Sequence, residues 1–278
     1  MPHKRLYISA DIEGIAGVVT GEHTMPAGFE YQQAREWMTN EVLAACNAAF
    51  DNGIEEIVIS DSHGNGQNLL LDRLPKGTQV VRSWPRPLCM MEGIDQGHYD
   101  AALLIGYHAS ATHQRGVLAH TLHGKGIVEV KLNGRSASET CISAATAGHF
   151  NVPVILVTGD DAYTEHAHEL FDDIETATVK WAHSTTSGRT LLPQDACELI
   201  YQETDRALKR RQTFKPFVIS DLPITVEVNC VSRRAAELLC FIKLFTRVSA
   251  TQVTFEAGDM LEVSKVLSFL VASGSLMV

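Results

Sequence analysis

The sequence lacks the features that mark secreted, membrane-spanning and nucleic-acid-binding proteins. Its six cysteines include no C-x-x-C pair, and no stretch reaches the ~20 apolar residues that a membrane helix needs. No charged leader followed by an apolar core and a small-residue cleavage site is visible at the N-terminus. Basic residues are outnumbered by acids, 23 to 33, whereas nucleic acids and anionic membranes require a basic surface. We therefore expect a cytoplasmic protein with reduced cysteines and with neither a nucleic-acid nor a membrane partner.

What the sequence contains is typical of a layered α/β protein. Of its 278 residues, 45% are hydrophobic and 20% charged, which is ordinary globular composition. Short, almost continuous apolar runs alternate with helical patterns, as expected for a mostly parallel sheet with helices on both faces. The predicted strands are Leu6–Ala10, Ile57–Ser60, Thr78–Val81, Ala101–Ile105, Ile127–Leu132 and Val152–Val157, and the predicted helices are Tyr31–Asn52 and Ser136–His149.

The last third of the chain predicts a second, smaller α+β lobe. The polar, Ser- and Thr-rich stretch from Trp181 to Pro193 is interpreted as a connection, followed by a helix to about Arg211. The pattern then predicts a strand, a helix, a strand and a helix, over Ile224–Cys230, Ser232–Phe241, Ala250–Phe255 and Asp259–Ala272. We accordingly predict a metal-binding catalytic α/β domain over residues 1–190 and a smaller domain over 191–278.

Two carboxylates follow the first predicted strand. Asp11 and Glu13 are two residues apart, so in an extended chain their side chains project from the same face. Gly14 then allows a sharp turn. Ligands of open α/β sheets bind at the carboxyl edge of the strands, although solvated acids at a strand end are the simpler alternative for this motif alone.

Histidines follow two further strands. His63 lies beyond the strand that ends near Asp61, and His108 lies beyond the strand over 101–105. In a parallel sheet these ends share one edge with Asp11 and Glu13. Carboxylates combined with imidazoles suit zinc, with manganese or cobalt as substitutes, and the two oxygens of Asp11 would allow it to bridge two metals.

Other polar residues have two interpretations each. Glu139 fits either a metal site or a capping box with Ser136. His120 and His123 are alternative proton-transfer groups, and local sequence does not choose between them. Asp160 and Asp161 fit a supporting or amine-binding role, or capping of a helix.

Six short motifs in order resemble the D-aminopeptidase DppA family, the M55 metallopeptidases. They are S-A-D-I-E-G, S-D-S-H-G, M-M-E-G-I-D, L-I-G-Y-H-A, G-V-L-A-H-T and V-T-G-D-D, from residue 9 to residue 161. The resemblance implies a two-zinc site, with two Zn²⁺ per subunit. It also implies that Asp11, Glu13, His63, His108 and Glu139 are the ligands and that His120 is the catalytic residue. Short peptides with an N-terminal D-residue, such as D-Ala-D-Ala, are the implied substrates, and a homo-oligomer, with a decamer known in the family, is the implied assembly.

Three functions compete at this point. The leading hypothesis is a metal-dependent aminopeptidase for D-residues. A two-metal amidase, phosphoesterase or L-specific aminopeptidase is the second, although phosphate substrates usually require Arg or Lys clamps and few basic residues lie near the predicted site. The third hypothesis is a non-catalytic, metal-stabilised assembly protein.

Overall fold

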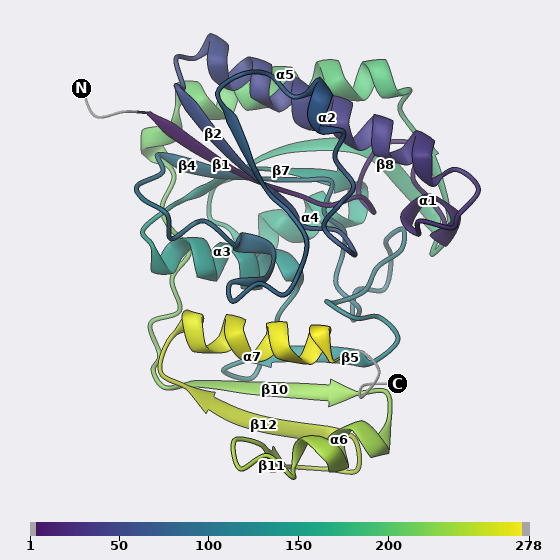
Figure 1. The fold of residues 1–278 in the computed structure, drawn as a ribbon, viewed down its shortest axis with the longest axis vertical. Helices are drawn as coiled ribbons and strands as arrows, with labels where there is room; N and C mark the ends of the chain where they lie inside the picture. Colours follow the sequence, from purple (N-terminus) through teal and green to yellow (C-terminus); the bar gives the residue numbers. More distant parts are fainter. Residues whose placement is uncertain (1–3, 274–278) are drawn as a thin grey trace.

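The computed structural model describes residues 4–273, which form two sheets with helices between and around them (Figure 1). The larger sheet has the strand order β3-β2-β1-β4-β7-β8-β9, and its neighbours are parallel except for the edge strand β9. Its strands are β1 (Arg5–Ala10), β2 (Glu56–Asp61), β3 (Thr78–Val81), β4 (Ala101–Ile105), β7 (Val154–Asp160), β8 (Glu175–Ser184) and β9 (Ser187–Thr190). Every residue of β4 and β7 is buried, which explains their continuous apolar sequence.

Helices cover both faces of this sheet. Helices α2 (Tyr31–Asp51) and α5 (Pro193–Lys209) pack against each other on one face, and α3 (Glu139–His149) and α4 (Asp161–Leu170) lie on the other (Figure 1). The apolar positions of α2 that recur at helical spacing, such as Ala34, Met38 and Val42, are fully buried. The predicted fold class, a mostly parallel sheet with helices on both faces, is confirmed.

The strand order reverses direction between β1 and β4, and this reversal locates the site. From β1 the chain adds β2 and β3 on one side, whereas β4 is followed by β7 and β8 on the other side. In open α/β sheets, ligands bind at the carboxyl edge of the strands beside such a reversal of strand order. Asp11 follows β1 and His108 follows β4, so both lie at this edge.

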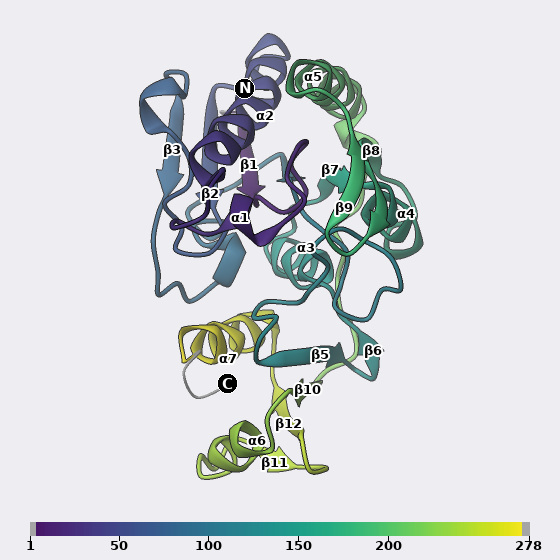
Figure 2. The same cartoon turned by 90° about the vertical axis from the view of Figure 1, so that its right-hand side faces the viewer.

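The smaller sheet is antiparallel and has the order β11-β12-β10-β5-β6. Its elements are β5 (Ile127–Leu132), β6 (Arg135–Ser136), β10 (Ile224–Cys230), β11 (Thr246–Arg247), β12 (Gln252–Ala257), α6 (Arg233–Leu239) and α7 (Met260–Ala272). Both helices pack on β10 and β12, and α7 also contacts α3 (Figure 2). The second lobe is therefore α+β, as predicted, and α7 joins it to the larger lobe.

Each of the two lobes draws on separate stretches of the chain. Strand β5 belongs to the smaller sheet although it precedes β7 in the chain, and α5 packs on the larger lobe although it follows residue 190. The alternation of buried Val130 and Leu132 with the partly exposed Glu129 and Lys131 explains why β5 suits a sheet covered on one face. The boundary at residue 190 itself stays a prediction.

The predicted connection from Trp181 to Pro193 is wrong. This stretch forms the end of β8, a tight turn and β9, which pair as an antiparallel hairpin at the edge of the larger sheet. The hairpin is half exposed, so its Ser and Thr residues face solvent and hide the strand pattern. Helix α4 and strand β8 were not predicted from the sequence. Four short helical turns complete the described elements: α1 (Gly21–Thr24), η1 (Leu71–Arg73), η2 (Cys89–Met91) and η3 (Arg211–Thr213).

Within residues 4–273, no helix has the length and apolar character needed to cross a bilayer.

Candidate metal centre

Asp11 and Glu13 lie in the tight turn that follows β1. The Asp11 amide donates to the carbonyl of Ile105 (2.8 Å), and the Gly14 amide donates to the carbonyl of Gly106 (2.7 Å), so the loops after β1 and β4 are joined directly. A Cβ at Gly14 would lie 1.9 Å from the carbonyl oxygen of Tyr107. Gly14 is therefore required by the close approach of the two loops, rather than by the sharp turn that the sequence suggested.

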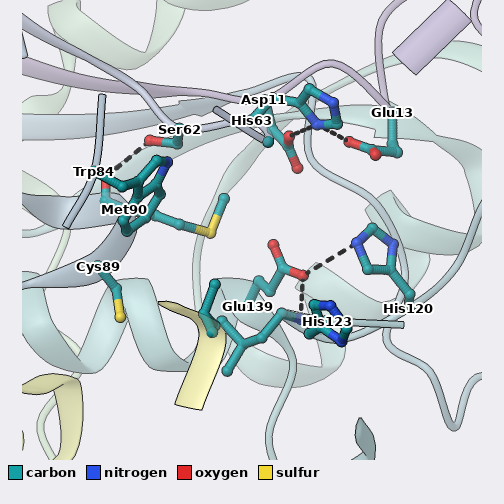
Figure 3. Close-up of a pocket in the computed structure, with 13 residues that line it drawn as sticks. Asp11, Glu13, Ser62, His63, Trp84, Cys89, Met90, His120, His123 and Glu139 are labelled. Atoms are coloured by element: carbon teal, nitrogen blue, oxygen red, sulfur yellow. Dashed lines mark hydrogen bonds and ion pairs between the residues drawn. The ribbon is translucent and has the colours of Figure 1, made fainter. Parts of the chain in front are cut away.

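His63, beyond β2, points one ring nitrogen at both of these carboxylates (Figure 3). Its Nδ1 lies 3.2 Å from Asp11 Oδ1 and 2.9 Å from Glu13 Oε2. Its Nε2 lies 2.7 Å from the carbonyl oxygen of Thr24, which can only accept, so Nε2 carries the proton that is donated. In the neutral ring, Nδ1 is then unprotonated, and its lone pair faces two carboxylate oxygens.

His108, beyond β4, repeats this arrangement with its nitrogens exchanged. Nδ1 donates to the carbonyl of Ala109 (2.9 Å), and Nε2 lies 3.5 Å from both Asp11 Oδ2 and Glu139 Oε1. The ring is almost completely buried, and its Nε2 has no hydrogen-bond partner among the described residues. A buried lone pair directed at two carboxylates is repulsive unless a cation or a proton lies between them.

Asp11 is the side chain that links the two halves of the centre. One of its oxygens faces His63 and the other faces His108. Two groups of possible ligands result, each with atoms within 4.8 Å of one another: Asp11, Glu13 and His63, and His108, His120 and Glu139. Asp11 therefore lies between the two groups and faces a histidine of each.

Glu139 begins helix α3, where the positive end of the helix favours its carboxylate. Its Oε1 accepts a hydrogen bond from the Leu122 amide (2.6 Å) and lies 3.8 Å from His120 Nε2. The residue that caps α3 is Ser138, whose hydroxyl accepts from the Cys141 amide. The alternative of a capping box between Ser136 and Glu139 is therefore wrong, since Ser136 lies in β6.

His120 lies at the edge of the centre and is its most exposed histidine. Its ring stacks on that of His108 with centroids 4.1 Å apart, and its side chain is 27% exposed. The carbonyl of Leu118 accepts from Nδ1 (2.9 Å), which leaves Nε2 free to face the pocket. The Asp160 carboxylate holds this loop through the amide of Val117 (2.6 Å).

The spacing of these atoms fits zinc. Zinc takes nitrogen and oxygen ligands at about 2.0–2.2 Å, so the ligand atoms of a tetrahedral site lie roughly 3.3–3.5 Å apart. Asp11 lies 3.2 and 3.5 Å from the nitrogens of His63 and His108, and Glu139 lies 3.5 and 3.8 Å from those of His108 and His120. Each of the three rings donates its other N–H to a main-chain carbonyl, the outer contact that orients metal-binding histidines.

The charges of the centre favour a bound cation. Burial and the charge of Glu13 raise the pKa of Asp11 to about 7. Burial lowers the pKa of His108, but the carboxylates of Glu139 and Asp11 outweigh it and raise that pKa to about 10. Burial raises the pKa of Glu139, and the nearby His108 more than offsets this, so the net shift is downward. The carboxylates thus require a cation, either a proton on an imidazole or a metal ion.

The remaining predicted residues lie around the centre. His123 lines the same pocket as His120, but within the described chain its Nδ1 makes no hydrogen bond. Asp160 caps α4 by accepting from the Tyr163 amide, and Asp161 accepts from the Ala182 amide. Both carboxylates therefore support the backbone, and neither lines the pocket.

Sequence analysis gave no role to Lys180 or to the pocket residues Trp84, Met90 and Val271. Lys180 is fully buried in β8, where its ammonium contacts the loop after β1. The only signal for Met90 was its place in the M-M-E-G-I-D motif. Val271 comes from α7 of the smaller lobe, so no local pattern places it here.

Three comparisons with known proteins each find a match. Residues 4–269 match the family model Peptidase_M55, described as D-aminopeptidase. A D-aminopeptidase of Bacillus subtilis (strain 168) is 32% identical over 260 residues, which is 93% of each chain. A solved structure described as the Zn-dependent D-aminopeptidase DppA from Bacillus subtilis, a self-compartmentalizing protease, matches with a TM-score of 0.92. It is 29% identical and the match covers 98% of each chain.

Proposed function

The chain belongs to the M55 family of D-aminopeptidases, and from this membership we propose that it removes N-terminal D-residues, of the D-Ala type, from short peptides at a two-zinc site. The observation that carries the proposal is the set of three imidazole nitrogens at the centre. Each of these nitrogens is unprotonated in the neutral ring, because the other ring nitrogen donates its N–H to a main-chain carbonyl. The lone pair of each faces a carboxylate.

In this proposal Asp11, Glu13 and His63 hold one zinc, and His108 and Glu139 hold the second, with Asp11 shared between them. The distances on both sides of Asp11 support the shared role. When bound, the zinc ions supply Lewis acidity, which polarises a carbonyl and lowers the pKa of water.

His120 transfers protons in the proposed reaction. Its partly exposed side chain lines the pocket, and its Nδ1 is occupied by the Leu118 carbonyl, so Nε2 is the atom that exchanges a proton with the substrate. Stacking on His108 fixes the ring plane. Protonation of the departing amine by Nε2 would make cleavage of the peptide bond possible at neutral pH.

The pocket favours a peptide over a phosphate ester. Among the described residues that line it there is no Lys or Arg, the side chains that usually clamp phosphate. The six cysteines are all unpaired, which fits a reducing compartment, so we propose a cytoplasmic location. Likeness to a protein described as self-compartmentalizing supports a homo-oligomer, and a decamer is the assembly that we propose.

The test is amine release from paired D- and L-dipeptides and aminoacyl amides, measured with the purified chain, after chelation and after zinc is restored. We expect zinc-dependent release from D-substrates. Release from L-substrates alone would overturn the stereochemical part of the proposal. Stoichiometric zinc without release from any substrate would overturn the aminopeptidase assignment and favour the non-catalytic alternative.

A further inference from the structure

The metal centre opens on one side into a cavity of about 290 Å³ whose far wall is apolar. Figure 3 shows Trp84, Cys89 and Met90 across the cavity from His120 and Glu13. The wall, which we call the apolar wall, consists of Trp84, Cys89, Met90, Leu122 and Val271. It combines the segment around η2, the loop after β4 and helix α7, so it forms only when the two lobes are packed together.

The Trp84 side of the apolar wall is held rigidly. The buried guanidinium of Arg86 lies 4.5 Å from the centre of the Trp84 ring. The same guanidinium donates to the carbonyls of Ser83 and Asp61 and to the hydroxyl of Ser60, which anchors it to the end of β2. The indole is thus fixed relative to the sheet that carries the metal centre.

Met90 and Cys89 form the floor of the cavity and are also held in place by hydrogen bonds. Met90 and Cys89 are 6% and 4% exposed, and the Met90 carbonyl accepts hydrogen bonds from the hydroxyls of Ser9 and Ser62. The Cys89 thiol donates to the carbonyl of Ser264 in α7 (3.3 Å). A preformed apolar surface of this kind selects ligands by size because it cannot move to accept a larger group.

The open side of the cavity lies at the opposite end. Gly64 is exposed and His120 is partly exposed, whereas Met90 and Cys89 close the cavity. A peptide whose terminal amine and first carbonyl lie at the metal centre has its remaining residues directed to the opening. The side chain of the N-terminal residue is then the group that faces the closed end.

We propose that the apolar wall is the subsite for the N-terminal side chain of the substrate, and that Met90 and Val271 restrict it to small, uncharged side chains. This inference rests on the proposed aminopeptidase function. No described residue of the wall carries a charge, so a Lys-like or Glu-like N-terminal side chain would be buried without an oppositely charged partner. A large aromatic side chain would meet the rigid Trp84.

The test uses the zinc-loaded, full-length chain and a series of D-aminoacyl p-nitroanilides with D-Ala, D-Val, D-Leu, D-Phe and D-Lys. For the wild type, we expect kcat/KM to fall from D-Ala through D-Leu to D-Phe and D-Lys. Met90→Ala deepens the floor and should raise the D-Leu to D-Ala ratio of kcat/KM by about tenfold or more, since one methylene in an apolar pocket changes kcat/KM by roughly 10–200-fold.

Met91→Ala is the matched control. Met91 is the next residue of the same helical turn and is also buried, but it does not line the cavity. It should leave the ratio unchanged. Val271→Phe, at a half-buried position of α7, should narrow the cavity and lower the same ratio, which tests the wall without a core truncation.

The outcomes separate the two proposals. Turnover with the same D-Leu to D-Ala ratio in wild type, Met90→Ala and Val271→Phe would overturn the subsite and leave the aminopeptidase function standing. An equal change in Met91→Ala would also overturn it, because the effect would then be general loosening. Absence of turnover on every substrate by the zinc-loaded wild type would overturn both proposals.

Discussion

The ammonium of Lys180 donates a hydrogen bond to the main-chain carbonyl of Glu13, from a fully buried position in β8. It also donates to the carbonyls of Ile15 (3.1 Å) and Val18 (2.6 Å), so its three N–H groups serve three carbonyls of one loop. Burial lowers the pKa of Lys180 to about 8, which leaves it mostly charged at pH 7. This loop carries Asp11 and Glu13 into the centre, and Lys180 fixes its course.

Replacing Lys180 by Met should weaken zinc binding by about 10–100-fold, the effect of losing an outer contact that orients metal ligands. The side chain keeps its length, but three buried carbonyls lose their shared donor, so the melting temperature should fall as well. Competition with a chelating dye, well below the melting temperature, measures the affinity. Lys131→Met, in the smaller sheet, is the control, and wild-type zinc affinity in Lys180→Met would contradict the positioning role.

Asp11→Asn should remove zinc from both positions, because its two oxygens face the two halves of the centre. Glu13→Gln and Glu139→Gln should each weaken mainly one position, since each carboxylate contacts one half. Metal analysis after gel filtration gives the number of zinc ions retained by each variant. Equal losses in all three variants would argue against a shared Asp11.

His120→Ala should retain zinc and lose roughly 10²–10⁴-fold in kcat, the usual contribution of a positioned acid–base group. Exogenous imidazole should restore part of the rate if proton transfer is the lost function. His123→Ala, on the same pocket wall, serves for comparison and should keep most activity. If His120→Ala instead loses one zinc ion, His120 is a ligand, as its place beside His108 and Glu139 would allow.

Zinc affinity should increase with pH. In the metal-free centre the neighbouring carboxylates overcome the effect of burial and hold the pKa of His108 at about 10, so at pH 7 this ring carries a proton that zinc must displace. Asp11, with a pKa of about 7, releases part of a proton over the same range. Calorimetric titration in buffers of different ionisation enthalpy should show net proton release at pH 7. An affinity that does not change between about pH 6 and pH 9 would contradict this assignment.

The sequence predicted those parts of the fold in which local pattern and burial agree. The strands at Leu6–Ala10 and Ala101–Ile105 are apolar throughout because both faces of the sheet are covered, so their strand ends, and with them Asp11 and His108, could be located. Lys180 was not assigned a role, since a lysine between apolar residues is normally exposed and its buried acceptors come from a loop distant in sequence.

The apolar wall could not be predicted for a related reason. Trp84 and Val271 come from different lobes, and their meeting depends on how α7 packs against η2. The spacing of hydrophobic residues within one segment does not predict a contact between two distant segments. The hairpin of β8 and β9 was missed because the pairing, rather than the composition, makes Ser187–Thr190 a strand.

The placement of β5 in the smaller sheet affects the order in which parts of the protein can fold during translation. Strand β5 lies in the chain between His120 and Glu139, yet Leu132 pairs with Val226, which leaves the ribosome much later. The edge that bears Asp11, Glu13 and His63 belongs to a sheet whose strands are complete once Thr190 has been made. We therefore expect the segment between His120 and Glu139 to be the last part of the centre to be fixed, because β5 finds its sheet partner only after β10 has emerged.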